Sequence, residues 1–169
     1  AHLEGLAGIR TFAFDKTGTL TEGRPRVSGV HALAGADPME VLRAAAAVEA
    51  RSEHPLARAV LAHARGQGLE PPEAGEFQSL PGRGASAVWE GRKVYVGNHR
   101  LFEELGWCVP QTESLLGSLQ SRGQTAVLVG SDGVVLGAVA VADRPRASAR
   151  QALAGLKRAG VRRTLMLTG

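Results

Sequence analysis

The chain has 169 residues, of which 44% are hydrophobic and 4% aromatic, and its formal net charge is +4. This length suits one ordinary domain or two small ones, and the composition indicates a globular core packed mainly by aliphatic side chains, which excludes a disordered chain. The single cysteine, Cys108, excludes a disulfide framework and a cysteine-pair metal site, so we expect it to be a small, partly buried apolar residue.

Two regional features narrow the class of protein further, with respect to membranes and nucleic acids. The most apolar stretch, residues 125–142, is broken by a Ser-Asp-Gly turn and is shorter than the roughly 20 residues of a membrane helix, so we expect a soluble chain. Residues 144–163 carry basic side chains and no acid. No aromatic residues are interleaved there for base stacking, so we expect a solvated helix face that meets a phosphate or a neighbouring domain, and no nucleic-acid partner.

The first predicted strand, residues 8–14, is of the buried type and ends in a cluster of reactive side chains. The sequence that follows, DKTGTLT at 15–21, brings a carboxylate (Asp15), a cation (Lys16) and hydroxyls to the end of that strand. An aspartate there can act as a nucleophile, a metal ligand or a cap, and carboxylate and carbonyl oxygens suit Mg²⁺. These are the groups that phosphoryl transfer needs, although an ordinary strand-end turn explains them equally well.

The middle of the chain predicts a mixture of helices and strands. Asp37 and Pro38 mark the start of a helix, and a second helix runs from about Pro55 to Gly66 or Gly68. Asp-Gly and Glu-Gly dipeptides between apolar runs predict hairpin turns. The remaining predicted strands cover residues 26–34, 76–80, 84–90, 92–97 and both halves of 125–142, and short helices cover 99–105 and 112–122.

The last predicted elements repeat the pattern of the first. An amphipathic helix at 147–160 precedes a strand of the buried type at 161–169, which ends in Thr168 and a glycine. In a parallel α/β sheet, ligands bind beyond the carboxyl ends of the strands. We therefore expect both chain ends to meet in one parallel sheet, with the middle inserted between the first strand and its crossover helix.

DKTGTLT resembles the phosphorylation motif of P-type ATPases, which have the haloacid-dehalogenase-like fold. The resemblance implies that Asp15 forms an aspartyl-phosphate, with Lys16 beside it, and that Asp15 and the carbonyl of Thr17 bind Mg²⁺. Phosphatases of that superfamily carry a second aspartate where this chain has Thr17. Without that general acid/base the phosphoenzyme should persist, which favours a pump over a phosphatase.

Further motifs resemble those of the heavy-metal-transporting P-type ATPases, in the expected order. SEHPLARAV at 52–60 implies that Glu53 and His54 line an adenine pocket. LPGRGASA at 80–87 is similar to the glycine loop of the family, with Ala87 in place of its third glycine, and VGN at 96–98 matches another part of the pocket. The nucleotide-binding residues implied by the two glycine-containing motifs are Gly82, Gly84, Gly97 and Asn98.

Two motifs near the end complete the resemblance. DRPR at 143–146 resembles the family's hinge, which implies that Asp143 and Arg146 let the nucleotide domain swing ATP towards Asp15. MLTG resembles the start of the Thr-Gly-Asp motif, so Thr168 would face the transferred phosphoryl group. The implied fold is α/β: a truncated haloacid-dehalogenase-like parallel sheet with an inserted α+β nucleotide-binding domain of antiparallel strands flanked by helices.

The implied domains are a first part of the phosphorylation domain at 1–24, the nucleotide-binding domain at 25–142 and a second, truncated part of the phosphorylation domain at 143–169. The implied cofactors are ATP and Mg²⁺, and the implied partners are the remaining phosphorylation, actuator and transmembrane domains of a parent pump. We expect that parent to lie in a plasma or inner membrane, with this segment on the cytoplasmic side. We expect the isolated chain to bind ATP but to have little or no activity, and its truncated part to expose apolar surface.

Alternatives remain for the transported ion and for the function. Residues 96–108 and 160–169 look slightly more like the zinc, cadmium and cobalt exporters than the copper-transporting ATPases, which are the alternative. A freestanding phosphatase of the superfamily is a more distant hypothesis, and a non-catalytic nucleotide-binding module is a third.

Overall fold

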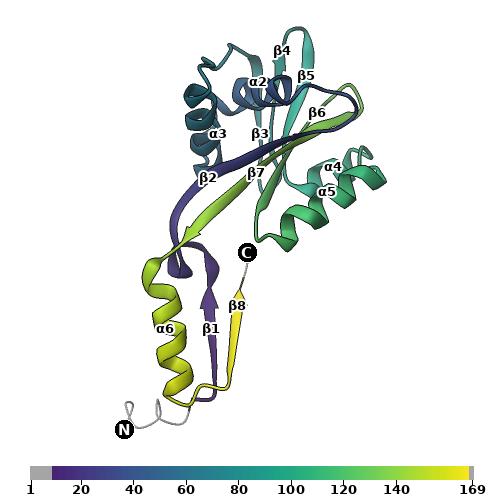
Figure 1. Cartoon of the computed structure of the whole chain (residues 1–169). Helices are drawn as coiled ribbons and strands as arrows, with labels where there is room; N and C mark the ends of the chain where they lie inside the picture. The colour runs from purple at the N-terminus through teal and green to yellow at the C-terminus, as the bar shows by residue number, and fades with distance from the viewer. Residues whose placement is uncertain (1–8, 168–169) are drawn as a thin grey trace. The chain divides into compact units, whose positions relative to one another are not determined.

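The computed structural model describes residues 9–167, apart from the side chains of Lys16 and Thr17. The chain forms two compact units (Figure 1): unit 1 contains the described parts of residues 1–24 and 143–169, and unit 2 contains Pro25–Ala142. The chain passes between the units twice, inside strand β2 (Thr21–Ala32) and inside strand β7 (Val134–Pro145). The predicted hinge, DRPR at 143–146, therefore lies largely within an extended strand.

Unit 1 contains a parallel pair of strands. β1 (Thr11–Asp15) runs beside β8 (Arg163–Leu167), so that Thr11 lies opposite Arg163 and Asp15 opposite Leu167. Helix α6 (Ala147–Arg158) precedes β8, and a single π-turn, η1 (Lys16–Leu20), follows β1. The whole of unit 2 is thus inserted between β1 and the crossover helix of a parallel sheet, as the sequence predicted.

The prediction that both strands of unit 1 are buried is wrong for the described residues. Every residue of β8 is exposed, with Leu165, Met166 and Leu167 at 44%, 58% and 57%, and in β1 only Phe12 and Phe14 are half-buried. Helix α6 has no buried residue. Two strands and one helix cannot cover both faces of a sheet, so apolar surface stays exposed, as we expected from the sequence.

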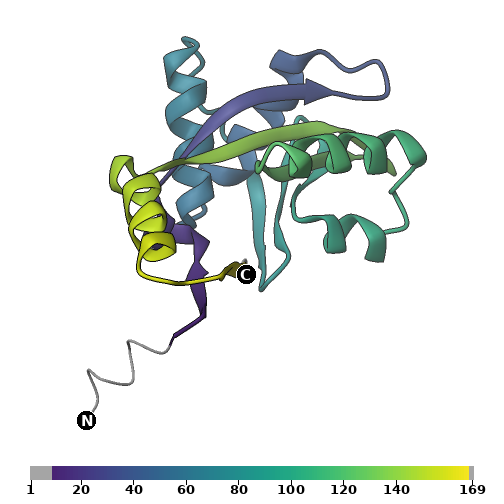
Figure 2. The ribbon, with the colours of Figure 1, turned by 60° about the horizontal axis from the view of Figure 1, so that its bottom comes forward.

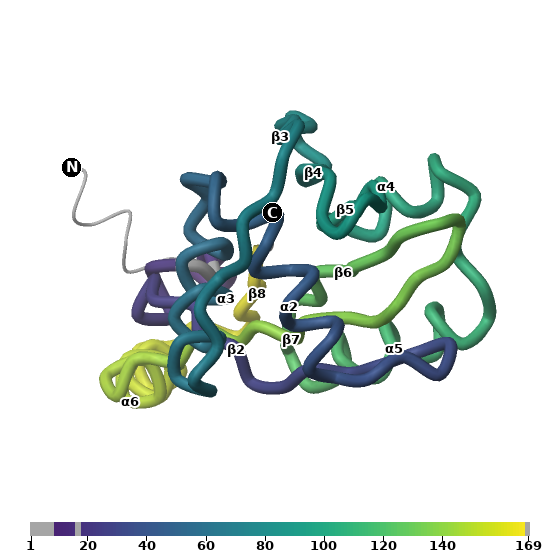
Figure 3. The backbone as a smooth tube through the Cα atoms, turned by 90° about the horizontal axis from the view of Figure 1, so that it is seen from above, coloured from purple at the N-terminus to yellow at the C-terminus, as the bar shows by residue number. Residues whose placement is uncertain are grey.

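Unit 2 is built on an antiparallel sheet. Its strand order is β2-β7-β6-β5-β4-β3, and Figure 3 shows the strands following one another in that order. Neighbouring strands from β3 to β7 are antiparallel. The bounds are Gly75–Leu80 for β3, Gly84–Trp89 for β4, Arg92–Gly97 for β5 and Thr125–Ser131 for β6.

The two tight hairpins of this sheet have the predicted turns. Glu90 and Gly91 have φ values of 49° and 74°, and Asp132 and Gly133 have φ values of 53° and 83°. Positive φ at both central residues matches the right-handed twist of the strands on either side, and aspartate and glycine tolerate it best. These dipeptides therefore fix the β4–β5 and β6–β7 registers.

Helix pairs pack on the two faces of the sheet (Figure 2). α2 (Pro38–Glu49) and α3 (Pro55–Gly66) pack with one set of sheet residues, and α4 (His99–Glu104) and α5 (Pro110–Ser121) with the other. Because side chains alternate along a strand, Val127 and Val129 of β6 join the first cluster and Leu128 joins the second. The start of α2 is capped as predicted, since Asp37 accepts a hydrogen bond of 2.6 Å from the Met39 N–H.

The α/β class is therefore confirmed, with a parallel pair in one unit and an antiparallel sheet flanked by helices in the other. Within residues 9–167, no helix has both the length and the apolar character needed to cross a bilayer.

Candidate functional site

A pocket of about 390 Å³ opens in unit 2, in the size range of small-molecule sites. Residues from four separate segments line it: the end of α2 and the start of α3, the β3–β4 loop, the end of β5, and the start of β6. Five of the six residues predicted to bind a nucleotide are among them, namely His54, Gly82, Gly84, Gly97 and Asn98. The sixth, Glu53, is exposed and does not line the pocket.

His54 is held at the mouth of the pocket by its role as the N-cap of α3. Its Nδ1 accepts a hydrogen bond of 3.2 Å from the Leu56 N–H. An imidazole that accepts at Nδ1 carries its proton at Nε2 when it is neutral. His54 therefore has a donor left for a ligand, and its ring orientation is fixed by the helix that it caps.

At two of these positions only glycine fits, because backbone atoms of a neighbouring strand or loop lie too close for a side chain. Gly84 of β4 pairs with Gly97 of β5. A Cβ on Gly84 would lie 2.1 Å from the carbonyl oxygen of Val96, and one on Gly97 would lie 2.3 Å from that of Arg83. Gly84 also has a φ of 153°, which side chains rarely adopt. These glycines let the β3–β4 loop lie directly on β5.

Asn98 joins this loop to the start of α4. Its Nδ2 donates to the carbonyl of Gly82 at 2.9 Å, and its backbone N–H donates to that of Arg83 at 2.8 Å. Its Oδ1 accepts from the Leu101 N–H at 3.1 Å, which caps α4. The contacts within unit 2 therefore make Asn98 a positioning residue for the glycine loop.

Glu49, which the sequence analysis missed, also lines the pocket. It is 7% exposed, and burial raises the pKa of its carboxyl, an effect that a hydrogen bond with Ser52 partly offsets. Glu49 is the last residue of α2, where the helix dipole disfavours negative charge. An acid at the carboxyl end of an alanine-rich helix was a signal that could have found it.

The walls of the pocket combine apolar surface with a cation. Phe77, Leu80 and Val96 contribute the apolar part. Arg83 lines the pocket too, and its guanidinium forms an ion pair of 2.6 Å with Glu104. The pocket can thus accept a flat apolar ring together with polar or anionic groups.

The structure describes only some of the residues of unit 1 that we predicted to take part in phosphorylation. Asp15 is exposed at the carboxyl end of β1, opposite Leu167. The backbone of Lys16 and Thr17 lies in η1, and Thr168 is outside the described residues. The proximity of Asp15 and Thr168 stays a prediction, which the pairing of Asp15 with the residue before Thr168 supports.

Asp143 holds the end of the DKTGTLT motif and the residues that follow it. Its Oδ2 accepts from the Thr21 hydroxyl at 2.5 Å and from the Gly23 N–H at 3.0 Å, and its Oδ1 accepts from the Arg24 N–H at 3.0 Å. Partial burial alone would raise the pKa of Asp143, but these hydrogen bonds, with one from the backbone of Arg144, outweigh it and lower the pKa.

Arg146 contacts the same segment. Its backbone N–H donates to the carbonyl of Leu20 at 2.8 Å, and its guanidinium donates to that of Gly18 at 2.9 Å. The Gly18 N–H in turn donates to the Thr21 hydroxyl at 3.1 Å. Both residues of the predicted hinge thus fix the backbone that follows Asp15.

Comparison with known proteins gives matches along nearly the whole chain. The family model of the haloacid dehalogenase-like hydrolases matches residues 9–169. A silver exporting P-type ATPase of Salmonella typhimurium is 36% identical, over 99% of this chain and 20% of that protein. A cadmium-transporting ATPase of Staphylococcus aureus is 36% identical (99% and 24%), and a probable copper-exporting P-type ATPase V of Mycobacterium tuberculosis is 42% identical (99% and 22%).

Solved structures give the same family. A zinc-transporting PIB-type ATPase in the E2.Pi state has a TM-score of 0.71 and 38% identity, over 98% of this chain and 26% of that one. The N-domain of a copper-transporting P-type ATPase has a TM-score of 0.58 and 35% identity, over 69% of this chain and 99% of that one. The chain spans about a fifth to a quarter of the length of the curated relatives described above. It belongs to the haloacid dehalogenase-like hydrolases, and its homologues within that family are heavy-metal P-type ATPases.

Proposed function

We propose that unit 2 is the ATP-binding domain of a heavy-metal-exporting P-type ATPase, and that Asp15 in unit 1 is the residue that ATP phosphorylates. The observation that carries the proposal is the pocket, because residues of three nucleotide-type motifs, separated by up to 44 positions from His54 to Asn98, line one cavity. The solved N-domain, matched over 69% of this chain, supports assigning nucleotide binding to unit 2. Unit 1 is then part of the phosphorylation domain.

The chemistry of the pocket suits adenine. Phe77, Leu80 and Val96 offer apolar surface for the base, and Phe77 can stack on its face. The buried carboxylate of Glu49 can accept from the exocyclic amine, and Nε2 of His54 can donate. The Gly82–Gly84 loop lets backbone N–H groups approach phosphate oxygens, and Arg83 supplies positive charge beside them.

The reaction proposed for unit 1 is transfer of a phosphoryl group to a carboxylate. A carboxylate oxygen of Asp15 attacks the γ-phosphorus, the bond from that phosphorus to the β–γ bridging oxygen breaks, and ADP leaves. Asp15 is exposed at a strand end, so an incoming phosphate can reach it. We propose that Lys16 neutralises phosphate charge and that Thr168 contacts the transferred group, while Thr17 in place of a second acid keeps the acyl phosphate from rapid hydrolysis.

The donor set at the end of β1 fits Mg²⁺. That ion takes oxygen ligands and is often bound by one or two carboxylates together with substrate phosphates. Asp15 offers an exposed carboxylate, and the backbone carbonyl of Thr17 is the second proposed ligand. Bound there, Mg²⁺ would supply charge neutralisation on the phosphates.

For the whole protein we propose export of a heavy-metal ion across a membrane, with this segment on the cytoplasmic side. The relatives are described as transporters of silver, cadmium, copper and zinc. Zinc, cadmium and cobalt remain our first choice of ion, and copper is the alternative. Metal-stimulated ATPase assays on the full-length protein, with these ions compared side by side, decide between them.

ATP titration of this chain by calorimetry tests the proposed pocket. We expect His54→Ala to weaken ATP binding about tenfold, the cost of one lost hydrogen bond and the contact around it. His63→Ala, a histidine of α3 that does not line the pocket, is the matched control and should bind as the unmodified chain does. Absence of ATP binding, or equal affinities in both variants, would refute the proposal.

Labelling of the full-length pump with radioactive ATP tests the phosphorylation step. Asp15→Asn should abolish the acid-stable phosphoenzyme, because an amide cannot form the acyl phosphate. Asp132→Asn, at the tip of the β6–β7 hairpin, should keep it. Normal labelling of the Asp15 variant would place the acceptor elsewhere.

A further inference from the structure

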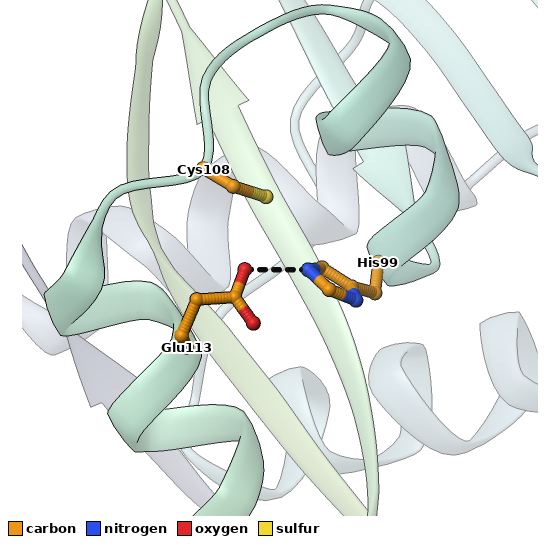
Figure 4. A group of neighbouring side chains, drawn as sticks. All are labelled: His99, Cys108 and Glu113. Carbon is orange, nitrogen blue, oxygen red and sulfur yellow. Dashed lines mark hydrogen bonds and ion pairs between the residues drawn. The ribbon is translucent and has the colours of Figure 1, made fainter.

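Three residues with different metal-binding atoms converge in unit 2 (Figure 4). His99 is the first residue of α4, Cys108 lies in the loop after it, and Glu113 lies in the first turn of α5. One ligand atom from each of the three side chains lies within 4.8 Å of the others. A carboxylate oxygen of Glu113 is 2.6 Å from Nε2 of His99. None of the three belongs to the pocket residues described above.

The loop that carries Cys108 is held in place by the core. The N–H of Trp107 donates to the Phe102 carbonyl at 3.0 Å, and that of Gly106 donates to the Glu103 carbonyl at 2.9 Å. The Trp107 ring packs edge-on against Tyr95 and Phe102, with centroid distances of 5.4 and 6.0 Å. The position of the neighbouring Cys108 is therefore set by packing, which is what a binding site needs to keep its ligands preorganised.

The charges around the cluster favour a cation. Glu103 lies one helical turn after His99, with a carboxylate oxygen 3.9 Å from Nε2 of His99. The carboxylates of Glu113 and Glu103 also place negative charge near the Cys108 sulfur. His99 and Cys108 are half-buried and Glu113 is exposed, so an ion can reach the three groups from solvent.

We propose that His99, Cys108 and Glu113 form a binding site for a divalent transition-metal ion of the zinc class. One nitrogen, one sulfur and one oxygen ligand suit Zn²⁺ and its analogues Cd²⁺ and Co²⁺, whereas Mg²⁺ and Ca²⁺ take oxygen ligands. Three protein ligands leave a fourth tetrahedral position, which Glu103 or a water can fill. The site is separate from the proposed Mg²⁺ position at Asp15 and does not depend on ATP binding.

The geometry requires only a modest rearrangement. Bond lengths of about 2.0–2.3 Å to the metal place tetrahedral ligand atoms roughly 3.3–3.7 Å apart, and the three ligand atoms here lie within 4.8 Å of one another. The exposed Glu113 side chain now forms a hydrogen bond with His99. If it rotates slightly away, an ion can lie between the two side chains and be bound by Nε2 of His99 and a carboxylate oxygen of Glu113. The competing explanation is that His99 and Glu113 form an ordinary ion pair and that the Cys108 thiol takes no part in binding.

Titration of the reduced chain with Co²⁺ separates these explanations, because a thiolate ligand gives a sulfur-to-metal charge-transfer band and an ion pair gives none. We expect about one Co²⁺ per chain with this band, and Zn²⁺ should displace it. Cys108→Ser and His99→Asn should each abolish the band and weaken metal binding more than about 100-fold, since even outer-shell changes cost 10- to 100-fold. Glu113→Gln should weaken binding while keeping the band.

His63→Asn is the matched control, since this histidine is also partly exposed on a helix but lies outside the cluster. It should leave both the band and the affinity unchanged. Circular dichroism of each variant reports whether the fold is intact. Absence of the charge-transfer band in the unmodified chain, or its persistence in the His99 variant, would overturn the proposal.

Discussion

The two units place the side chains of the proposed sites on very different supports. In unit 2, helices cover both faces of the sheet, and Phe102 and Leu128 are completely buried within one of its two clusters. In the described part of unit 1, α6 buries none of its residues, and the apolar residues of β8 are exposed. The proposed nucleotide pocket is therefore built on a packed core, whereas the segment after Asp15 is held mainly by polar contacts of Asp143 and Arg146.

Phe102→Ala should have the largest effect on this contrast. The side chain is 0% exposed, and replacing a buried phenylalanine with alanine costs about 3–5 kcal/mol through lost burial and the cavity left behind. Met166→Ala in β8, where the side chain is 58% exposed, should change the free energy of unfolding by less than about 0.5 kcal/mol. Urea denaturation of both variants measures the difference.

If the methionine variant lost as much stability as the phenylalanine variant, β8 would have to be packed in solution. The contrast between the two units would then be wrong.

The fold of unit 2 was largely predictable because its signals are local. Asp37-Pro38 starts α2, and the Glu90-Gly91 and Asp132-Gly133 turns have the backbone that their residue types favour. The exposure of β8 was not predictable from its own residues, since an apolar run such as 165–167 looks the same whether or not a neighbouring element covers it. Burial depends on the elements that pack around a strand, which periodicity does not record.

The candidate site shows the same division between local and distant information. Motifs identified His54, Gly84 and Asn98, and the structure brings these residues to one pocket. The predicted role of Gly84 in nucleotide approach stays a prediction, whereas the closeness of the Val96 carbonyl shows that packing requires a glycine there. The ligand set of His99, Cys108 and Glu113 matches no short motif, because a loop and two helices are needed to bring its members together.

Asp143→Asn probes the polar support of unit 1 and should have an intermediate effect. The amide lacks the negative charge that strengthens the hydrogen bonds from the Thr21 hydroxyl and from the N–H groups of Gly23 and Arg24. The free energy of local opening should therefore fall by about 1–3 kcal/mol. Amide hydrogen exchange should therefore accelerate in residues 18–24 and stay unchanged in the core strands β4 to β6. Arg144→Gln, an exposed neighbour, is the control.

The lowered pKa of Asp143 gives this prediction a pH dependence. A carboxyl with a lowered folded-state pKa stabilises the fold above its unfolded value of 3.8, and the stability is lost as the pH falls through the folded pKa. The acid-induced increase in exchange at residues 18–24 should be present in the unmodified chain and absent in Asp143→Asn. Equal acid responses in the two proteins would show that Asp143 does not hold this segment.

Glu49→Gln should change stability less than Phe102→Ala or Asp143→Asn does, and its effects on stability and on ATP binding should have opposite signs. Because burial raises the pKa of Glu49, the fold loses stability as the pH rises from the unfolded value of 4.5 through the folded pKa, and the neutral amide escapes this loss. We expect the variant to be more stable at pH 7, by up to about 1 kcal/mol.

The same variant should bind ATP about tenfold more weakly, through loss of a charge-assisted hydrogen bond. Glu53→Gln, four positions along and exposed, should change neither quantity, because that residue does not line the pocket. Thermal unfolding from pH 4 to 8 and ATP calorimetry measure the two quantities on the same samples. If the Glu53 variant lost ATP affinity and the Glu49 variant kept it, Glu53 would be the residue that contacts adenine, as the SEHP motif implies. The buried carboxylate of Glu49 would then have no role in binding.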